Sequence, residues 1–246
     1  MTETEWGAAV DPAAMLTAAA PRVSDRKLRL YLVGCCRRRW GLFTDPRCRS
    51  AVETAERVAD GLATDTARGQ ALVQAREAFE GSQWRRAGAE RPDDDRRVAD
   101  AAWVACDRAD DLRRRTFRRE GGATAVWAAG AAVSLEQAYA RAAVRAGERA
   151  EFEAVRAGER AAQADLLRCV FGNPFVYTVP EPGWRTAAVL GLAAAVYDAR
   201  AFDRLPILAD ALEEAGCADP AVLAHCRHHP EHARGCWVVD LLLDKS

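Results

Sequence analysis

The chain has 246 residues, of which 50% are hydrophobic and 29% are charged, and its formal net charge is −1. This composition is typical of a folded globular protein and excludes a disordered chain. The near-neutral charge also excludes a strong overall field that would attract nucleic acid or an anionic membrane, so we expect neither kind of partner.

The N-terminal segment and the hydropathy pattern lead to an expected location. MTETEWGAAVDP is acidic and has no basic stretch followed by an apolar run, so no secretory signal is predicted. No stretch approaches the run of about 18 apolar residues that indicates a membrane-spanning helix. The eight cysteines have no regular disulfide spacing. We therefore expect a cytoplasmic protein with reduced thiols.

Helical periodicity recurs along nearly the whole chain, whereas alternating patterns typical of strands are nearly absent. Aspartate, serine or threonine precedes several of the apolar stretches, as helix N-caps do. Asp11 and Asp219 are each followed by a proline, which favours the first helical position. In the first part of the chain, helices are predicted to begin at Pro12 and to span 25–43, 46–60 and 64–86, with Ser24 and Thr44 among the caps.

The middle of the chain is Ala-rich and contains an internal repeat. A polar connection is predicted at 87–97, and a further helix then stops at Gly121 and Gly122. AVRAGERAEFE (143–153) is followed directly by AVRAGERAAQA (154–164). Eleven residues make three turns of about 3.67 residues, so equivalent positions return to nearly the same helix face. One nearly continuous helix is predicted over 134–171.

The C-terminal part begins with an irregular, proline-containing stretch over 171–183. A helix is predicted over 184–202, and three short amphipathic or apolar units follow, PILADALEEAG, DPAVLAHCR and CWVVDLLLDK. The expected fold is therefore all-α, with roughly eight to ten helices and one long Ala-rich central helix. We expect a helical body over 1–171 and a C-terminal subdomain of short helices over 172–246 that packs on it.

HCRHHPEHARGC, residues 225–236, holds all four histidines of the chain and two of its cysteines. The favoured interpretation is a charged turn between two packed helices. In it, the helix after Asp219 buries Val222 and Cys226, residues 228–235 turn the chain, and 236–243 return as an apolar helix. Histidine and arginine at the end of the first helix suit the negative end of its dipole. The residue types then need no ligand, and no cofactor is expected.

A metal site is the second interpretation of this segment. Cys226 with His229, and His232 with Cys236, have spacings of three and four residues and supply two thiols and two imidazoles. Zinc prefers four such ligands in a tetrahedron. The segment has no CxxC pair, however, and the gap between the two pairs is shorter than in usual zinc sites. Zinc thus remains an alternative.

A nuclease is the third interpretation. Arg227 and His232 form an R-x4-H element that resembles the catalytic motif of the all-α HEPN ribonucleases, in which Arg and His act on the scissile phosphate and the 2′-hydroxyl. Pro230 interrupts the helix that this motif requires. The chain shows no recognisable pair of catalytic carboxylates, no Gly-rich phosphate loop and no nucleophile elbow. An enzyme is therefore the less favoured class.

Several segments resemble a large bacterial family of Ala-rich proteins with many paralogues. They are SDRKLRLYLVGCCRRRW, LLRCVFGNPF, RLPILADALEEAGC, LAHCR and HARGCWVVDLLL, which together give a C-terminal pattern LADALEEAG…HxR…HxRGCWxxDLLL. LADALEEAG is also similar to the LADWLEE element of a small repeat-companion domain. Neither resemblance implies an activity or a ligand. The shared pattern contains the candidate binding residues His225, Arg234, Trp237 and Asp240.

The expected function is that of a non-catalytic cytoplasmic helical protein that mediates macromolecular interaction, most simply with another protein. The first alternative is a zinc-stabilised helical module that uses the His and Cys residues of 225–236. The second is a HEPN-like ribonuclease that uses Arg227 and His232. An exposed apolar surface would favour an interaction protein, whereas a concave polar pocket around the histidines would favour an enzyme.

Overall fold

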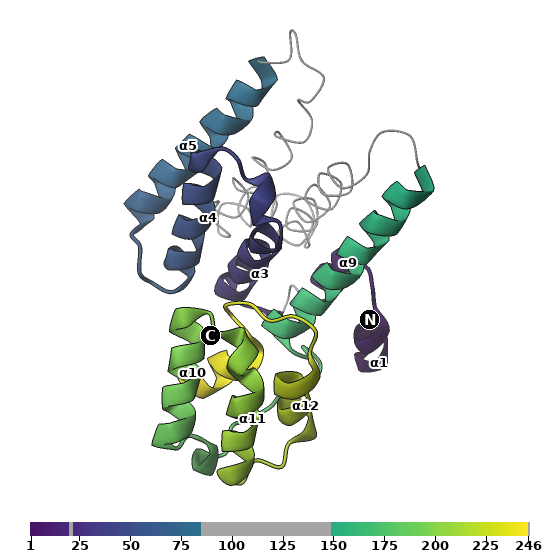
Figure 1. The fold of residues 1–246 in the computed structure, drawn as a ribbon, viewed down its shortest axis with the longest axis vertical. Coiled ribbons are helices and arrows are strands. Elements are labelled where there is room, and N and C mark those ends of the chain that lie inside the picture. Colours follow the sequence, from purple (N-terminus) through teal and green to yellow (C-terminus); the bar gives the residue numbers. More distant parts are fainter. Residues whose placement is uncertain (20–21, 85–148, 246) are drawn as a thin grey trace. The chain divides into compact units, whose positions relative to one another are not determined.

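The computed structural model describes residues 1–19, 22–84 and 149–245 (Figure 1). Within these ranges the chain forms ten α-helices and three short 3-10 helices, and it contains no strand. The predicted all-α class is confirmed. The predictions for 87–97, for the helix that stops at Gly121 and for the first part of the long helix lie outside the described residues. No helix of the described ranges is long and apolar enough to cross a membrane.

The chain forms two compact units. The middle unit comprises Ala9–Ala164, and the C-terminal unit comprises Asp165–Ser246 together with the N-terminal residues Met1–Ala8. The compact units thus divide seven residues before the boundary expected between 171 and 172, and α1 (Glu3–Ala8) belongs to the same unit as the last helices. Helix α9 (Arg149–Phe171) contributes to both units.

The helices of the middle unit begin where side chains can cap them. Ser24 accepts a hydrogen bond from the N–H of Lys27 and starts α3 (Asp25–Arg38). The predicted cap at Thr44 is wrong by one residue, because Asp45 accepts from the N–H of Arg47 and Pro46 follows it at the first helical position of α4 (Pro46–Ala59). The predicted helix over 25–43 is also shorter than expected, and its last turn is a separate 3-10 helix, Trp40–Leu42.

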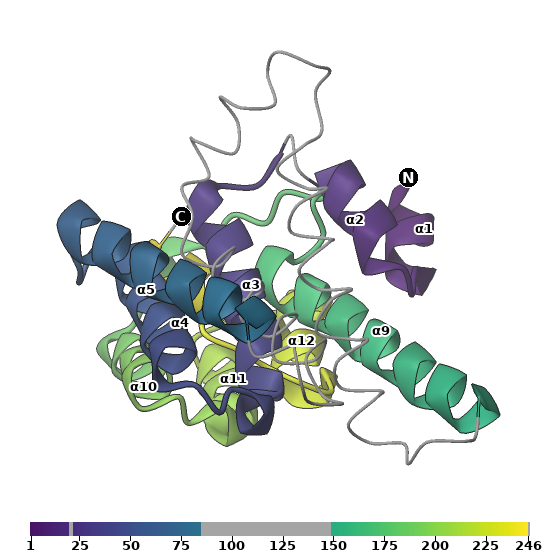
Figure 2. The ribbon, with the colours of Figure 1, turned by 90° about the horizontal axis from the view of Figure 1, so that it is seen from above.

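Packing in the middle unit joins α3 to α4 and α4 to α5 (Asp65–Trp84). Both ribbon views show α4 running beside α5 (Figures 1 and 2). Helix α2 (Pro12–Ala19) and the first part of α9 complete the described helices of this unit. Its largest fully buried side chains are apolar or aromatic: Met15, Leu16, Leu30, Tyr31 and Phe43.

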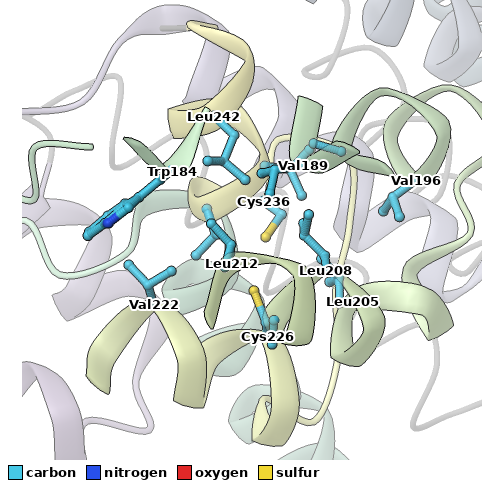
Figure 3. Packing of buried hydrophobic residues seen from close by; sticks show 14 of the residues in the cluster. Trp184, Val189, Val196, Leu205, Leu208, Leu212, Val222, Cys226, Cys236 and Leu242 are labelled. Atoms are coloured by element: carbon cyan, nitrogen blue, oxygen red, sulfur yellow. The ribbon is translucent and has the colours of Figure 1, made fainter. Parts of the chain in front are cut away.

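The C-terminal unit is built from short helices around one apolar cluster (Figure 3). Helix α10 contacts α11 and α13, and α12 contacts α11 and α13. The cluster contains Leu208 and Leu212 of α11, and it also contains the thiols of Cys169, Cys226 and Cys236. The elements after α9 are the 3-10 helix Pro182–Trp184, α10 (Ala187–Ala199), the 3-10 helix Phe202–Arg204, α11 (Leu205–Glu214), α12 (Pro220–His228) and α13 (Trp237–Leu243).

Helix α1 (Glu3–Ala8) is held on the end of α9. The indole Nε1–H of Trp6 donates to the carbonyl of Gly172 at 3.0 Å, and the guanidinium of Arg168 donates to the carbonyl of Trp6. The ring of Trp6 also meets Phe175 edge-on. These bonds fix the last turn of α9, which carries Cys169.

Candidate metal centre

Four potential metal ligands converge in the C-terminal unit. Cys169 lies in the last turn of α9, His225 in the last turn of α12, and His232 in the loop before α13, while Cys236 is the N-cap residue of α13. One ligand atom from each of the four residues lies within 4.8 Å of each of the others. Among the described residues, no other such group of three or more His, Cys, Asp or Glu residues is found.

Local sequence signals place three of these ligands. Asp219 caps α12 by accepting from the N–H groups of Ala221 and Val222. The helix ends at His228, and the next residue, His229, has the extended conformation (φ −67°, ψ 132°) that is favoured before proline. Gly235, with φ of +92°, makes the left-handed turn that brings the chain to Cys236. Residues 229–236 therefore form a turn between α12 and α13, close to the turn that was predicted over 228–235.

The distances between the ligand atoms agree with tetrahedral coordination. Sγ of Cys169 lies 3.6 Å from Nδ1 of His232, Nε2 of His225 lies 3.3 Å from Sγ of Cys236, and Nδ1 of His232 lies 3.9 Å from the same sulfur. With Zn–S bonds of about 2.3 Å and Zn–N bonds of about 2.0–2.1 Å, a tetrahedral ion sets its sulfur and nitrogen ligands about 3.6 Å apart. The cluster can therefore hold a metal ion without a large rearrangement.

The electrostatics of the cluster favour a thiolate. Burial raises the pKa of the Cys236 thiol, but the hydrogen bond from Cys169 and the contacts with His225 and His232 lower it by more, so that it lies well below its ordinary value of 9.0. The two sulfurs are fully buried, and His225 is only 8% exposed, whereas His232 is half-buried. A thiolate and imidazoles in a dry site are the donors that soft divalent metals prefer.

A third imidazole stands beside the four ligands. The ring of His229 lies 4.6 Å from that of His225 and 5.1 Å from that of His232, measured between centroids. Its Nδ1 lies 2.7 Å from the carbonyl oxygen of Glu231. Burial and the two neighbouring imidazoles lower the pKa of His229 to about 4. His229 is not one of the four residues whose ligand atoms converge.

The end of α9 and the start of α13 fit tightly together next to the site. Gly172 closes α9 in a left-handed conformation with φ of +65°, and a Cβ at this position would lie 3.0 Å from Cγ of Trp237. The half-buried Trp237 ring also packs 5.4 Å from the ring of His225. The candidate binding residue Trp237 thus supports two ligand-bearing segments.

The other sequence candidates lie in different surroundings. Arg234 donates a hydrogen bond to the backbone carbonyl of Tyr197 at 3.3 Å, and its guanidinium lies 4.8 Å from the centre of the Tyr197 ring. Asp240 is buried in α13. Cys226 is a member of the apolar cluster, where burial raises the pKa of its thiol. Its sulfur is drawn among the aliphatic side chains of the core in Figure 3.

The two residues of the R-x4-H element make separate sets of contacts. Arg227 forms ion pairs with Asp210 and Glu213 of α11. His232 instead faces the thiols of Cys169 and Cys236.

The metal set inferred from sequence overlaps the observed cluster only in part. His232 and Cys236 belong to both, whereas Cys226 and His229 are replaced by Cys169 and His225. Sequence spacing did not identify Cys169, because it lies 63 residues before His232. One signal was available. LLRCVFGNPF, which contains Cys169, is among the segments that carry the family resemblance together with the HxR and HxRGCW elements.

Comparison of the chain with protein-family models, with curated proteins and with solved structures found no match.

Proposed function

We propose that the C-terminal unit is a zinc-stabilised helical module, with one ion bound by Cys169, His225, His232 and Cys236. The observation that supports this most strongly is the convergence of all four ligand atoms within 4.8 Å. Two thiols and two imidazoles are a common ligand set of structural zinc sites.

The nature of the ligands favours a structural over a catalytic ion. Catalytic zinc usually keeps one position for water or substrate, whereas structural zinc has four protein ligands. Here four protein side chains would supply all four ligands of a tetrahedral ion, and three of them are buried. Zinc would join the end of α9 to α12 and α13, which have nine and seven residues and gain little stability from their own backbone. The non-catalytic interaction protein expected from sequence is compatible with this role and stays a prediction.

Metal content and thermal stability test the proposal together. We expect the purified full chain to bind one Zn²⁺, and Co²⁺ in its place to give the intense visible bands of a tetrahedral thiolate site. Removal of zinc by a chelator should lower the melting temperature, because an ion present at about 1,000 times its Kd contributes about 4 kcal/mol to folding. Less than stoichiometric binding, or an unchanged melting curve after verified removal of zinc, would contradict the proposal.

A further inference from the structure

Three imidazole rings, and not two, lie close to one another at the candidate metal centre. The centroid separations are 4.6 Å between His225 and His229, 4.9 Å between His225 and His232, and 5.1 Å between His229 and His232. Two imidazoles on one tetrahedral zinc ion would have their centroids about 5 Å apart, given Zn–N bonds of about 2.0–2.1 Å. The third ring is thus spaced from the other two as a ligand would be.

The hydrogen bond made by His229 leaves one of its nitrogens ready to accept a metal. Nδ1 of His229 lies 2.7 Å from the carbonyl oxygen of Glu231 and 3.4 Å from the N–H nitrogen of the same residue. The carbonyl oxygen can only accept, so the shorter contact favours the tautomer with the hydrogen on Nδ1. Nε2 of the neutral ring then carries a lone pair. Within the described ranges, this atom is buried and has no hydrogen-bond partner. A buried acceptor without a partner is costly, and a metal ion would satisfy it.

His232 is the ligand that His229 is best placed to replace. Cys169 and His225 lie in helices, Cys236 caps one, and all three are buried. His232 lies in the connecting loop and is half-buried, and only Pro230 and Glu231 separate it from His229. Exchange of His232 for His229 would therefore need a shift of this loop and would leave the other three ligands on their helices.

We propose that His229 is an alternate ligand of this metal centre, whose Nε2 takes the coordination position of His232 when that side chain dissociates. The inference rests on the proposed zinc site and adds a route for metal exchange to it. Five donors then serve four positions, so the ion changes one ligand without leaving the protein. The site would exchange its zinc faster than a site with four donors alone.

Metal titration of the full chain separates an alternate ligand from a packing residue. Zn²⁺ affinity is measured by competition with a chromophoric chelator for the wild type, for His232→Ala, and for the double variants His229→Ala/His232→Ala and His228→Ala/His232→Ala. His228 is exposed and adjacent, which makes it the matched control. We expect His232→Ala to lose about 10- to 100-fold in affinity, and removal of His229 from it to cost a further factor of about 100, whereas removal of His228 changes nothing more.

The cobalt spectrum and the exchange rate provide independent measurements. We expect Co²⁺-loaded His232→Ala to keep its tetrahedral bands and the His229 double variant to lose them. The single variant His229→Ala keeps the four converging ligands, so its zinc affinity should equal that of the wild type. Its exchange of bound zinc for isotopically labelled zinc should be about tenfold slower, because the alternate ligand no longer lowers the barrier to exchange.

Several results would overturn the inference. These are equal affinities of His232→Ala and its His229 double variant, a wild-type exchange rate in His229→Ala, or a loss of affinity in His229→Ala as large as that in His232→Ala. If the wild type binds zinc and any of these is observed, His229 is not an alternate ligand and the zinc site stands. If the wild type binds no zinc, both proposals fail.

Discussion

The two units of the chain satisfy their buried polar groups in different ways. In the middle unit, the buried carboxylate of Glu159 accepts hydrogen bonds from the guanidinium groups of Arg38 and Arg39, and Glu56 is paired with Arg37 at 3.0 Å. In the C-terminal unit, the buried groups beside α9 are thiols and imidazoles that contact one another at 3.3–3.9 Å. The buried charges are paired within the chain, whereas the set of soft donors would be completed by the metal ion that we propose.

Cysteines show the same difference. Cys35 in α3 is fully buried, and burial raises the pKa of its thiol to about 12, so it remains a neutral apolar group. Cys236 is buried to the same degree, yet its neighbours Cys169, His225 and His232 lower the pKa of its thiol well below the ordinary value. Burial alone therefore does not show whether a cysteine is a packing residue or a potential metal ligand. The groups that face its sulfur distinguish the two roles.

The largest expected effect comes from removing one sulfur from the candidate metal centre. Structural zinc contributes about 10–16 kcal/mol of binding free energy, so one of four ligands accounts for about 3 kcal/mol or more, equivalent to over a hundredfold in affinity. We expect Cys169→Ala to lose zinc affinity by at least this factor in a competition titration. Cys48→Ala, which removes a buried sulfur from the middle unit, is the matched control and should bind zinc as the wild type does. Equal zinc affinities of Cys169→Ala and Cys48→Ala would show that the cysteines of the two units do not differ in metal binding.

The next largest effect is expected in the middle unit. Glu159→Gln removes the charge that faces Arg38 and Arg39, whose side chains are only 13% and 20% exposed. Breaking a buried ion pair from one side typically costs about 3–5 kcal/mol of unfolding free energy. Denaturant unfolding measures this loss, and the zinc affinity should not change.

An exposed glutamate on α4 gives the control for that measurement. Glu53 lies 4.0 Å from Arg37 and its side chain is 55% exposed, so Glu53→Gln should change the unfolding free energy by less than about 1 kcal/mol. Equal destabilisation by Glu159→Gln and Glu53→Gln would show that the buried ion pairs do not stabilise the middle unit more than exposed ones. A loss of zinc affinity in Glu159→Gln would show that the two units do not satisfy their buried polar groups independently.

The sequence predicted the fold class and many helix ends, because these depend on local patterns. Ser24 and Asp219 cap the helices that they were expected to start. The described part of the long Ala-rich helix, Arg149–Phe171, ends at Phe171 as predicted, whereas residues 134–148 lie outside the description. The helix predicted to reach Phe43 ends at Arg38, since a 3-10 turn interrupts it.

Of the candidate site, the sequence predicted only the ligands that lie close together along the chain, His232 and Cys236. Periodicity indicates which face of a helix is buried, but it does not indicate which distant segment packs against that face. His232 and Cys236 lie four residues apart in a turn, and their joint role was considered from spacing alone. Cys169 is brought to them by the packing of α9 against the apolar cluster, and Gly172 and Trp237 fix that contact. A long-range contact of this kind leaves no spacing signal.

The smallest expected effect concerns Arg227, which joins α12 to α11 at the surface of the C-terminal unit. Its guanidinium lies 2.6 Å from Asp210 and 3.0 Å from Oε1 of Glu213. Because both partners are exposed, Arg227→Ala should lower the melting temperature only slightly, and less at high salt.

The same ion pair should make the effect of Arg227→Ala depend on pH, because the hydrogen bond from Arg227 lowers the pKa of Glu213 below its ordinary value of 4.5. A carboxyl group whose pKa is lower in the folded than in the unfolded protein stabilises the fold at pH values above the unfolded-state pKa. This stabilisation is lost as the pH falls through the folded-state pKa. The difference between wild type and Arg227→Ala should therefore be present at neutral pH and disappear in acid. Paired thermal melts measure it, with the exposed Arg204→Ala as the control. A large difference that persists in acid would mean that Arg227 supports the metal centre and not only the surface between two helices.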